Sequence, residues 1–309
     1  MKVGIIGAGA VGSACAFALM HRRSAREIVL VDRDRRRAAA VATDMQYGTP
    51  LVSTIDIRDG SDEDLAGSDV IMITAGVNEK NGGATDRSDG EGRLRLLDLN
   101  VGIYEEIVPA IVAAAPEAVL MVVTDPPDPL ADLTRHLAQH DRVFSTGTVI
   151  DSLRLRVHIA RELDVSPDAV EAMVIGEHGT SEVMLWSSAR VSGVPIQDVS
   201  ADLDTLRRRV EHDVRYANIS IIEGNNASQY GIGIASARLA EAVLRDERTV
   251  FPVASFHESY GVTMAMPTVV GREGPTSVFT PAMSSLERGQ LDQSVARLRS
   301  AVSRLGMRT

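Results

Sequence analysis

Short apolar runs recur through the first half of the chain. They lie at residues 2–6, 27–31, 69–74, 118–124 and 143–145, and each has the length of a buried strand. Stretches with helical spacing separate them, at residues 13–20, 34–45 and 100–115. Strands that alternate with helices in this way predict an α/β unit with a parallel, doubly wound sheet.

The pattern changes after residue 146. Long helices are predicted at residues 151–163, 202–223 and 228–244, and strand-like segments at 169–175, 183–191, 250–256 and 268–270. A last helix places Leu291, Val295 and Leu298 on one face. We therefore expect two units, residues 1–146 and residues 147–309, the second an α+β unit of helices and short strands.

Composition excludes several classes of protein. The chain has 309 residues, 44% of them hydrophobic, and 32 basic against 42 acidic side chains. A net charge of −10 disfavours nucleic acid or an anionic membrane as partner. The single cysteine, Cys15, allows no intrachain disulfide and no cysteine-based zinc site, and we expect no metal. No apolar run is long enough to span a bilayer, and we expect a cytoplasmic protein.

A glycine-rich turn follows the first predicted strand. Gly7, Gly9 and Gly12 form the pattern G-x-G-x-x-G, with Val11 inside it. A glycine at the middle position lets a pyrophosphate approach the backbone, and the helix that follows offers free N–H groups and a partial positive charge. Because the motif lies between a predicted strand and a predicted helix, it indicates a dinucleotide site rather than an ordinary turn.

Asp32 ends the second predicted strand, 20 residues after Gly12. A carboxylate there accepts hydrogen bonds from the adenosine ribose and repels a 2′-phosphate, which favours NAD over NADP. Four arginines follow closely, at positions 33, 35, 36 and 37. They are typical of a solvated helix start, but they leave NADP open because arginines can hold a phosphate.

Three further motifs carry groups for acid–base and anion chemistry. Asp151 and Arg154 lie three residues apart on a predicted helix, in Asp-Ser-Leu-Arg, so they share a face. His178 lies in the turn Gly-Glu-His-Gly, and Arg93 lies where a polar loop meets a helix. Each has a plain alternative, namely a helix salt bridge, a structural histidine or a surface arginine.

The order of these motifs resembles the L-lactate/L-malate dehydrogenase family. The resemblance runs through almost the whole chain, from GAGAVG through Thr74-Ala75-Gly76, DSLR and GEHG to GREG at residues 271–274. It implies an N-terminal Rossmann domain, NAD as cofactor with Thr74, Ala75 and Gly76 near it, and a 2-oxo or 2-hydroxy acid as substrate. Family members are usually dimers or tetramers, so a homo-oligomer is expected. The segments 17–32 and 188–196 look more like the lactate branch.

The resemblance also implies roles for the charged residues. His178 matches the proton donor, and Asp151 matches the carboxylate that orients it and stabilises imidazolium. Arg154 matches the guanidinium that grips the substrate carboxylate with two parallel hydrogen bonds. Arg93 matches the loop arginine that polarises the substrate carbonyl.

The loop before Arg93 departs from the family because residues 77–92 form a longer connection than usual. A residue early in this loop reads the substrate side chain in the family, where arginine selects oxaloacetate. Counting back from Arg93 gives Arg87, which favours malate dehydrogenase, whereas counting forward from Gly76 gives Glu79, which would repel oxaloacetate. Arg87 could equally be a solvated loop residue.

Two substitutions change the substrate end. Asp125 stands where the family has an asparagine close to the nicotinamide ribose and the substrate, and an ionised carboxylate there costs substrate binding unless it is protonated or turned away. Ser228 stands where a threonine usually lines the substrate side chain; it enlarges the site or only caps a helix.

The favoured hypothesis is an NAD-dependent L-2-hydroxy acid dehydrogenase of the lactate type. The alternatives are a malate dehydrogenase, a dehydrogenase of bulkier 2-oxo acids, and a dinucleotide-binding protein without catalysis.

Overall fold

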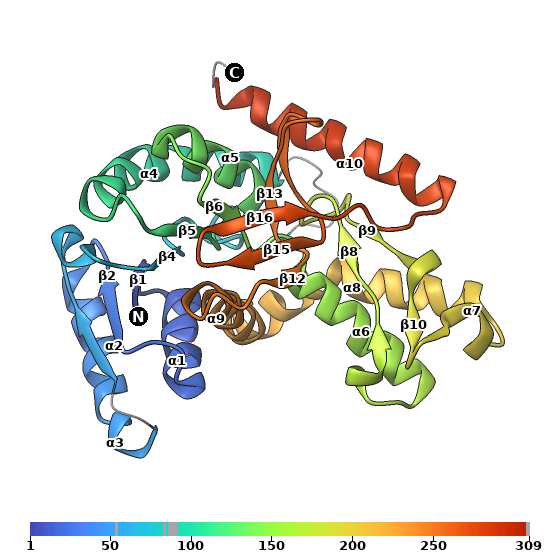
Figure 1. Cartoon of the computed structure of the whole chain (residues 1–309), viewed down its shortest axis with the longest axis horizontal. Helices are drawn as coiled ribbons and strands as arrows, with labels where there is room; N and C mark the ends of the chain where they lie inside the picture. The colour runs from blue at the N-terminus through green and yellow to red at the C-terminus, as the bar shows by residue number, and fades with distance from the viewer. Residues whose placement is uncertain (53–54, 83–84, 86–91, 307–309) are drawn as a thin grey trace.

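An eight-stranded sheet forms the centre of the molecule (Figure 1). The computed structural model describes residues 1–52, 55–82, 85 and 92–306. The sheet has the order β14-β13-β6-β5-β4-β1-β2-β3. Its strands are β1 (Lys2–Ile6), β2 (Glu27–Val31), β3 (Asp56–Asp59), β4 (Val70–Ile73), β5 (Val119–Val122), β6 (Val143–Ser145), β13 (Ala254–His257) and β14 (Val262–Ala265). Strands β1 to β6 are parallel, which confirms the predicted doubly wound sheet. The hairpin of β13 and β14 adds antiparallel strands from the second half of the chain.

The described residues form ten α-helices, several of which bury both faces of this sheet. They are α1 (Ala10–Arg22), α2 (Arg35–Gln46), α3 (Thr49–Val52), α4 (Gly92–Ala114), α5 (Pro127–Ala138), α6 (Val149–Leu163), α7 (Ile196–Val199), α8 (Leu203–Asn225), α9 (Tyr230–Leu244) and α10 (Ser285–Arg304). Successive strand residues point to opposite faces. Met72 and Met121 therefore join one apolar cluster with α1 and α9, while Ile73 and Leu120 join another with α4 and α5. Figure 1 shows α1 and α9 packed side by side.

The second half of the chain forms three small sheets from short strands. They are β11-β10-β7, β12-β15-β16 and β8-β9. Their strands are β7 (Val170–Glu171), β8 (Val174–Ile175), β9 (Val183–Met184), β10 (Arg190–Val191), β11 (Val194–Pro195), β12 (Thr249–Phe251), β15 (Thr268–Gly271) and β16 (Gly274–Val278). In the part of the chain that the structure describes, three 3-10 turns complete the fold, at Asp62–Leu65, Pro167–Ala169 and Trp186–Ser188.

Several predicted strands were wrong in extent. The segment 250–256 is two strands in different sheets, because Pro252 lies between them and has no N–H for a ladder. The segment 183–191 is broken by the 3-10 turn Trp186–Ser188, and the segment 169–175 is split between β7 and β8. Strand β3 was not predicted, because its sequence DIRD carries one apolar residue.

Within the residues that the structure describes, no helix combines the length and the apolar character needed to cross a membrane.

Candidate active site

The glycine-rich turn joins β1 to α1 and opens into a cleft. Gly7 has φ of 101°, and a Cβ on Gly12 would lie 1.9 Å from the Gly7 carbonyl oxygen, so both positions require glycine. A Cβ on Gly9 would meet no atom of the described residues within 4 Å, and Gly9 and Val11 line the cleft. No side chain caps the start of α1. The turn therefore leaves room and free N–H groups for a pyrophosphate.

Asp32 follows β2 and is fastened to this turn. Its Oδ2 accepts a hydrogen bond of 2.7 Å from the Ala8 N–H, and its Oδ1 accepts one of 2.8 Å from the Asp34 N–H. Carboxylate oxygens have further lone pairs for ribose hydroxyls. The neighbouring arginines are exposed at the start of α2, and Arg37 reaches the lining of the cleft.

The Thr74-Ala75-Gly76 segment follows β4 at the same edge of the sheet. The Thr74 hydroxyl donates to the carbonyl oxygens of Ile6 and Gly7, at 3.0 and 2.8 Å. Thr74 and Gly76 line the cleft, whereas Ala75 packs against the apolar cluster below. The three sequence motifs expected to hold the cofactor therefore meet at the carboxyl ends of β1, β2 and β4.

His178 is held in the turn between β8 and β9. The Thr148 hydroxyl donates to the Val174 carbonyl at 2.5 Å, and the Ser152 hydroxyl accepts from the Val174 N–H at 2.9 Å. These bonds tie β8 to the start of α6, where Asp151 lies. The strand that leads to His178 is therefore fixed beside the helix that carries Asp151.

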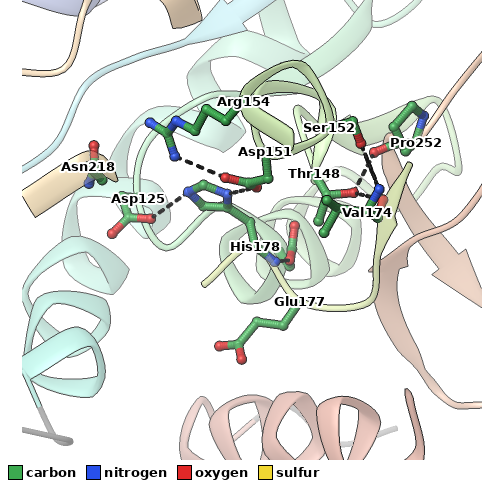
Figure 2. Close-up of polar contacts among 12 residues, drawn as sticks. Asp125, Thr148, Asp151, Ser152, Arg154, Val174, Glu177, His178, Asn218 and Pro252 are labelled. Carbon is green, nitrogen blue, oxygen red and sulfur yellow. Dashed lines mark hydrogen bonds and ion pairs between the residues drawn. The ribbon is translucent and has the colours of Figure 1, made fainter. Parts of the chain in front are cut away.

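Asp151 joins the predicted proton donor to the predicted anion anchor. Its Oδ2 lies 2.5 Å from His178 Nδ1, and its Oδ1 accepts a hydrogen bond of 2.9 Å from Arg154 Nη1. The Asp151 side chain is only 2% exposed. Figure 2 shows the imidazole between the carboxylates of Asp151 and Asp125. His178, Asp151 and Arg154 come together as the sequence predicted.

Burial and charge act in opposite directions on this pair. Burial lowers the pKa of His178, but the charge and hydrogen bond of Asp151 outweigh it and raise the pKa to about 9. Burial also raises the pKa of Asp151, and the cations of His178 and Arg154 reverse this, so that the net pKa lies below its ordinary value. Both effects favour imidazolium beside carboxylate.

Arg93 enters the site from the first turn of α4. Its Nη2 donates to Asp125 Oδ1 and to the His178 carbonyl oxygen, each at 2.7 Å. Asp125 Oδ1 also lies 3.8 Å from His178 Nε2. The Asp125 carboxylate therefore faces the site and is not turned away.

Glu79, Asn218 and Ser228 line the same cleft. Asn218 donates to Glu79 Oε1 at 3.2 Å, and burial raises the pKa of Glu79. Helix α9 begins at Tyr230 with Gln229 as its N-cap, so Ser228 lines the cleft and is not that cap. Arg87 lies outside the described residues.

Asp128 and Asn100 support the site but were missed in the sequence. Asp128 is fully buried; its carboxylate accepts from the Ser145 hydroxyl at 2.6 Å and from the His178 N–H at 2.7 Å, while burial raises its pKa to about 6. Asn100, also buried, accepts from the Val77 N–H at 2.7 Å and donates to the Asp125 carbonyl at 2.9 Å. A polar residue inside an apolar helical stretch was the available signal for Asn100.

The cleft brings two kinds of chemistry together. One end offers backbone N–H groups and the Asp32 carboxylate, and the other offers an imidazole with a raised pKa and two guanidinium groups. Such a site suits proton transfer at a carbonyl beside a carboxylate. Among the residues that the structure describes, no group of three or more His, Cys, Asp or Glu is placed to hold a metal.

Two domain families match the chain. The first, "lactate/malate dehydrogenase, NAD binding domain", matches residues 1–145, and the second, "lactate/malate dehydrogenase, alpha/beta C-terminal domain", matches residues 148–306. The sequence is 43% identical to an L-lactate dehydrogenase of Deinococcus radiodurans, covering 99% of this chain and 100% of the relative. It is 41% identical to an L-lactate dehydrogenase of Thermus aquaticus, with coverage of 99% and 100%.

Solved structures agree with these sequence matches. The fold is similar to that of the minor L-lactate dehydrogenase of Enterococcus mundtii in a ligand-bound form, with a TM-score of 0.90 at 30% identity over 98% of this chain and 97% of the other. It is equally similar to a lactate dehydrogenase from a Medee basin deep-sea metagenome, with a TM-score of 0.91 at 30% identity over 99% of both chains. With both domain families matched in order along nearly the whole chain, the protein belongs to the lactate/malate dehydrogenase family of NAD-dependent 2-hydroxy acid dehydrogenases.

Proposed function

We propose that the protein interconverts a pyruvate-type 2-oxo acid and the matching L-2-hydroxy acid, as its relatives named L-lactate dehydrogenase do. The observation that carries this proposal is the contact of 2.5 Å between His178 Nδ1 and Asp151 Oδ2, with Arg154 on the other oxygen of the same carboxylate.

His178 serves as the proton donor in the reducing direction. When bound, the nicotinamide cofactor supplies a hydride to the carbonyl carbon, which leaves negative charge on the oxygen. His178 Nε2 faces the cleft, because Nδ1 is engaged by Asp151, and it transfers its proton to that oxygen. Asp151 stabilises the imidazolium beforehand and holds the ring in one orientation.

Arg154 and Arg93 act on different groups of the substrate, namely its carboxylate and its carbonyl. Arg154 lines the cleft and is oriented by Asp151, so its free N–H groups hold the substrate carboxylate. Arg93 lies against His178 and stabilises the charge that develops on the carbonyl oxygen.

The glycine turn, Asp32 and the Thr74–Gly76 segment form the proposed cofactor site. The open space at Gly9 and the uncapped start of α1 fit a pyrophosphate. Asp32 fits the adenosine ribose, which supports NAD over NADP. Asp125 lies between this region and the reacting end of the substrate.

Glu79 supports a lactate-type substrate over a malate-type substrate. A second substrate carboxylate would enter a cleft already lined by Glu79 and Asp125, and like charges there weaken binding. We therefore expect pyruvate to be preferred over oxaloacetate by about tenfold or more in kcat/KM, since 1.4 kcal/mol of repulsion suffices for a factor of ten.

A panel of 2-oxo acids with NADH and NADPH tests this function. The panel contains pyruvate, oxaloacetate and branched and aromatic 2-oxo acids, and the readout is cofactor oxidation. Preference for pyruvate supports the proposal. A preference for oxaloacetate that disappears in Arg87→Gln would identify a malate dehydrogenase. A preference for the branched or aromatic acids would identify a dehydrogenase of bulkier 2-oxo acids, and no turnover with any acid would identify a non-catalytic protein.

Three broader features complete the proposal. We place the domain boundary at 146/147, between the two matched family segments. We expect the protein to be cytoplasmic. We also expect a homo-oligomer, and large apolar side chains that are exposed on α1, α3 and α9 support this, namely Phe17, Leu51, Tyr230 and Ile234. Light scattering on the purified protein measures the number of subunits.

A further inference from the structure

One oxygen atom of Asp125 lies between the two groups that act on the substrate carbonyl. Asp125 Oδ1 accepts a hydrogen bond of 2.7 Å from Arg93 Nη2 and lies 3.8 Å from His178 Nε2. In the proposed reaction, the substrate carbonyl oxygen must approach these same two nitrogens. The carboxylate of the protein and the carbonyl of the substrate therefore require the same place.

We propose that Asp125 is an internal competitor that occupies the position the substrate carbonyl oxygen would take and sets the affinity for the 2-oxo acid. This inference rests on the proposed function. It assigns to Asp125 the role of a specificity-determining residue that must withdraw its side chain before the substrate is polarised.

The backbone carbonyl of Asp125 is anchored to a buried side chain, so we expect the carboxylate to withdraw by rotation of its own side chain. Asn100 Nδ2 donates to the Asp125 carbonyl oxygen at 2.9 Å, and Asn100 is buried in α4. The other carboxylate oxygen, Oδ2, is buried without a hydrogen-bond partner among the described residues. Arg93 therefore holds Oδ1 by a hydrogen bond, whereas Oδ2 has no such bond among the described residues to keep it in place.

The charges around Asp125 make this competition costly for the substrate. Among the described residues, Arg93 and His178 are cations that face it, and Glu79 is a second carboxylate close enough for the two to repel each other. A hydrogen bond between a guanidinium and a carboxylate is roughly twice as strong as one between neutral groups. The neutral carbonyl of a 2-oxo acid must therefore replace a stronger partner of Arg93.

The variant Asp125→Asn tests this role with little change in shape. An amide keeps the size of the side chain but loses the charge that holds Arg93. We expect oxamate, an unreactive isostere of pyruvate, to bind the NADH complex of D125N about tenfold more tightly, which we derive from the loss of the charge-assisted bond. We also expect KM for pyruvate to fall about tenfold while kcat changes less than KM.

Glu79→Gln is the matched control, because it removes a carboxylate from the same cleft but keeps the hydrogen bond between Asp125 and Arg93. Oxamate titrations of NADH fluorescence are run at pH 8 on wild type, D125N and E79Q, with thermal unfolding to verify that each is folded. A gain in D125N that clearly exceeds the gain in E79Q supports competition at the carbonyl position. Equal gains would show that only the general negative charge matters, and the inference would be wrong.

Two further outcomes separate this inference from the proposed function. Unchanged or weaker oxamate binding in D125N, with pyruvate still reduced by the wild type, overturns the inference alone. Failure of the wild type to reduce any 2-oxo acid overturns the proposed function, and the inference with it.

Discussion

The two ends of the cleft are built by different means. At the cofactor end, the decisive features are spaces, because Gly9 faces an opening that is free of atoms from the residues the structure describes, and Gly12 lies against the Gly7 carbonyl. At the substrate end, the decisive features are charges that hold one another, with Asp151 on His178 and Arg154, and Asp125 on Arg93. A change of volume should therefore damage the first end, and a change of charge the second.

The largest expected effect comes from removing the titrating group at the substrate end. His178→Asn keeps the approximate shape of the ring but cannot donate the proton, and proton transfer by a positioned side chain contributes about 10²–10⁴-fold. We expect kcat for pyruvate reduction to fall about 10³-fold while NADH binding, measured by fluorescence, stays close to wild type. Near wild-type turnover in this variant would remove His178 from the mechanism.

Two alanine substitutions distinguish the glycine that leaves room for the cofactor from the glycine that the packing of the fold requires. Gly9→Ala adds a methyl group at the place where the pyrophosphate of the cofactor would approach the backbone. We therefore expect the affinity for NADH to fall on the order of tenfold, while the melting temperature stays unchanged. Gly12→Ala places a methyl group against the Gly7 carbonyl and should destabilise the fold by about 1–3 kcal/mol. Calorimetry and NADH titration of both variants sharpen the contrast. If both variants melt like wild type, the packing argument at Gly12 is wrong.

The pH dependence provides the smallest and most specific contrast. Reduction needs imidazolium and oxidation needs neutral imidazole, and the pKa of His178 is raised to about 9 because Asp151 outweighs burial. Consequently kcat/KM for pyruvate should stay level up to about pH 9 and fall above it, while kcat/KM for L-lactate rises toward that pH. At pH 7.5 the raised pKa leaves about tenfold more imidazolium than the ordinary value of about 6.5 would. A descending limb near pH 6.5 would contradict the role of Asp151.

Periodicity predicted the cofactor end well and the substrate end only in part. The apolar runs of β1, β2 and β4 and the glycine spacing are local signals, and the fold places them as expected. Strand β3 was not predicted from the apolar pattern, because a strand at the edge of a sheet tolerates the charged sequence DIRD. The prediction of a single strand at 250–256 was wrong because it gave too little weight to Pro252, which has no N–H for a ladder and divides the segment between two sheets.

The charged residues of the substrate end could be identified from the sequence, but only some of their contacts could be predicted. Asp151 and Arg154 share a helix turn, so their contact was predictable. The contacts of Asp125 with Arg93 and of Asp128 with the His178 N–H join residues 32 and 50 positions apart. No periodicity encodes such distances; they arise from the crossing of α4, α5 and the β8–β9 turn in the folded chain.

The hydrogen bond from the His178 backbone to Asp128 has a consequence for engineering chimeras. Asp128 lies on α5, within the segment matched as the NAD-binding domain, yet it fixes the turn that carries the proton donor. Recombining this half with the other half of a distant homologue would therefore separate an anchor from the loop it secures. A crossover placed at the domain boundary would preserve both folds and still misplace the imidazole of His178. To avoid this, Asp128 and its partner Ser145 on β6 must be taken from the same parent as the second half.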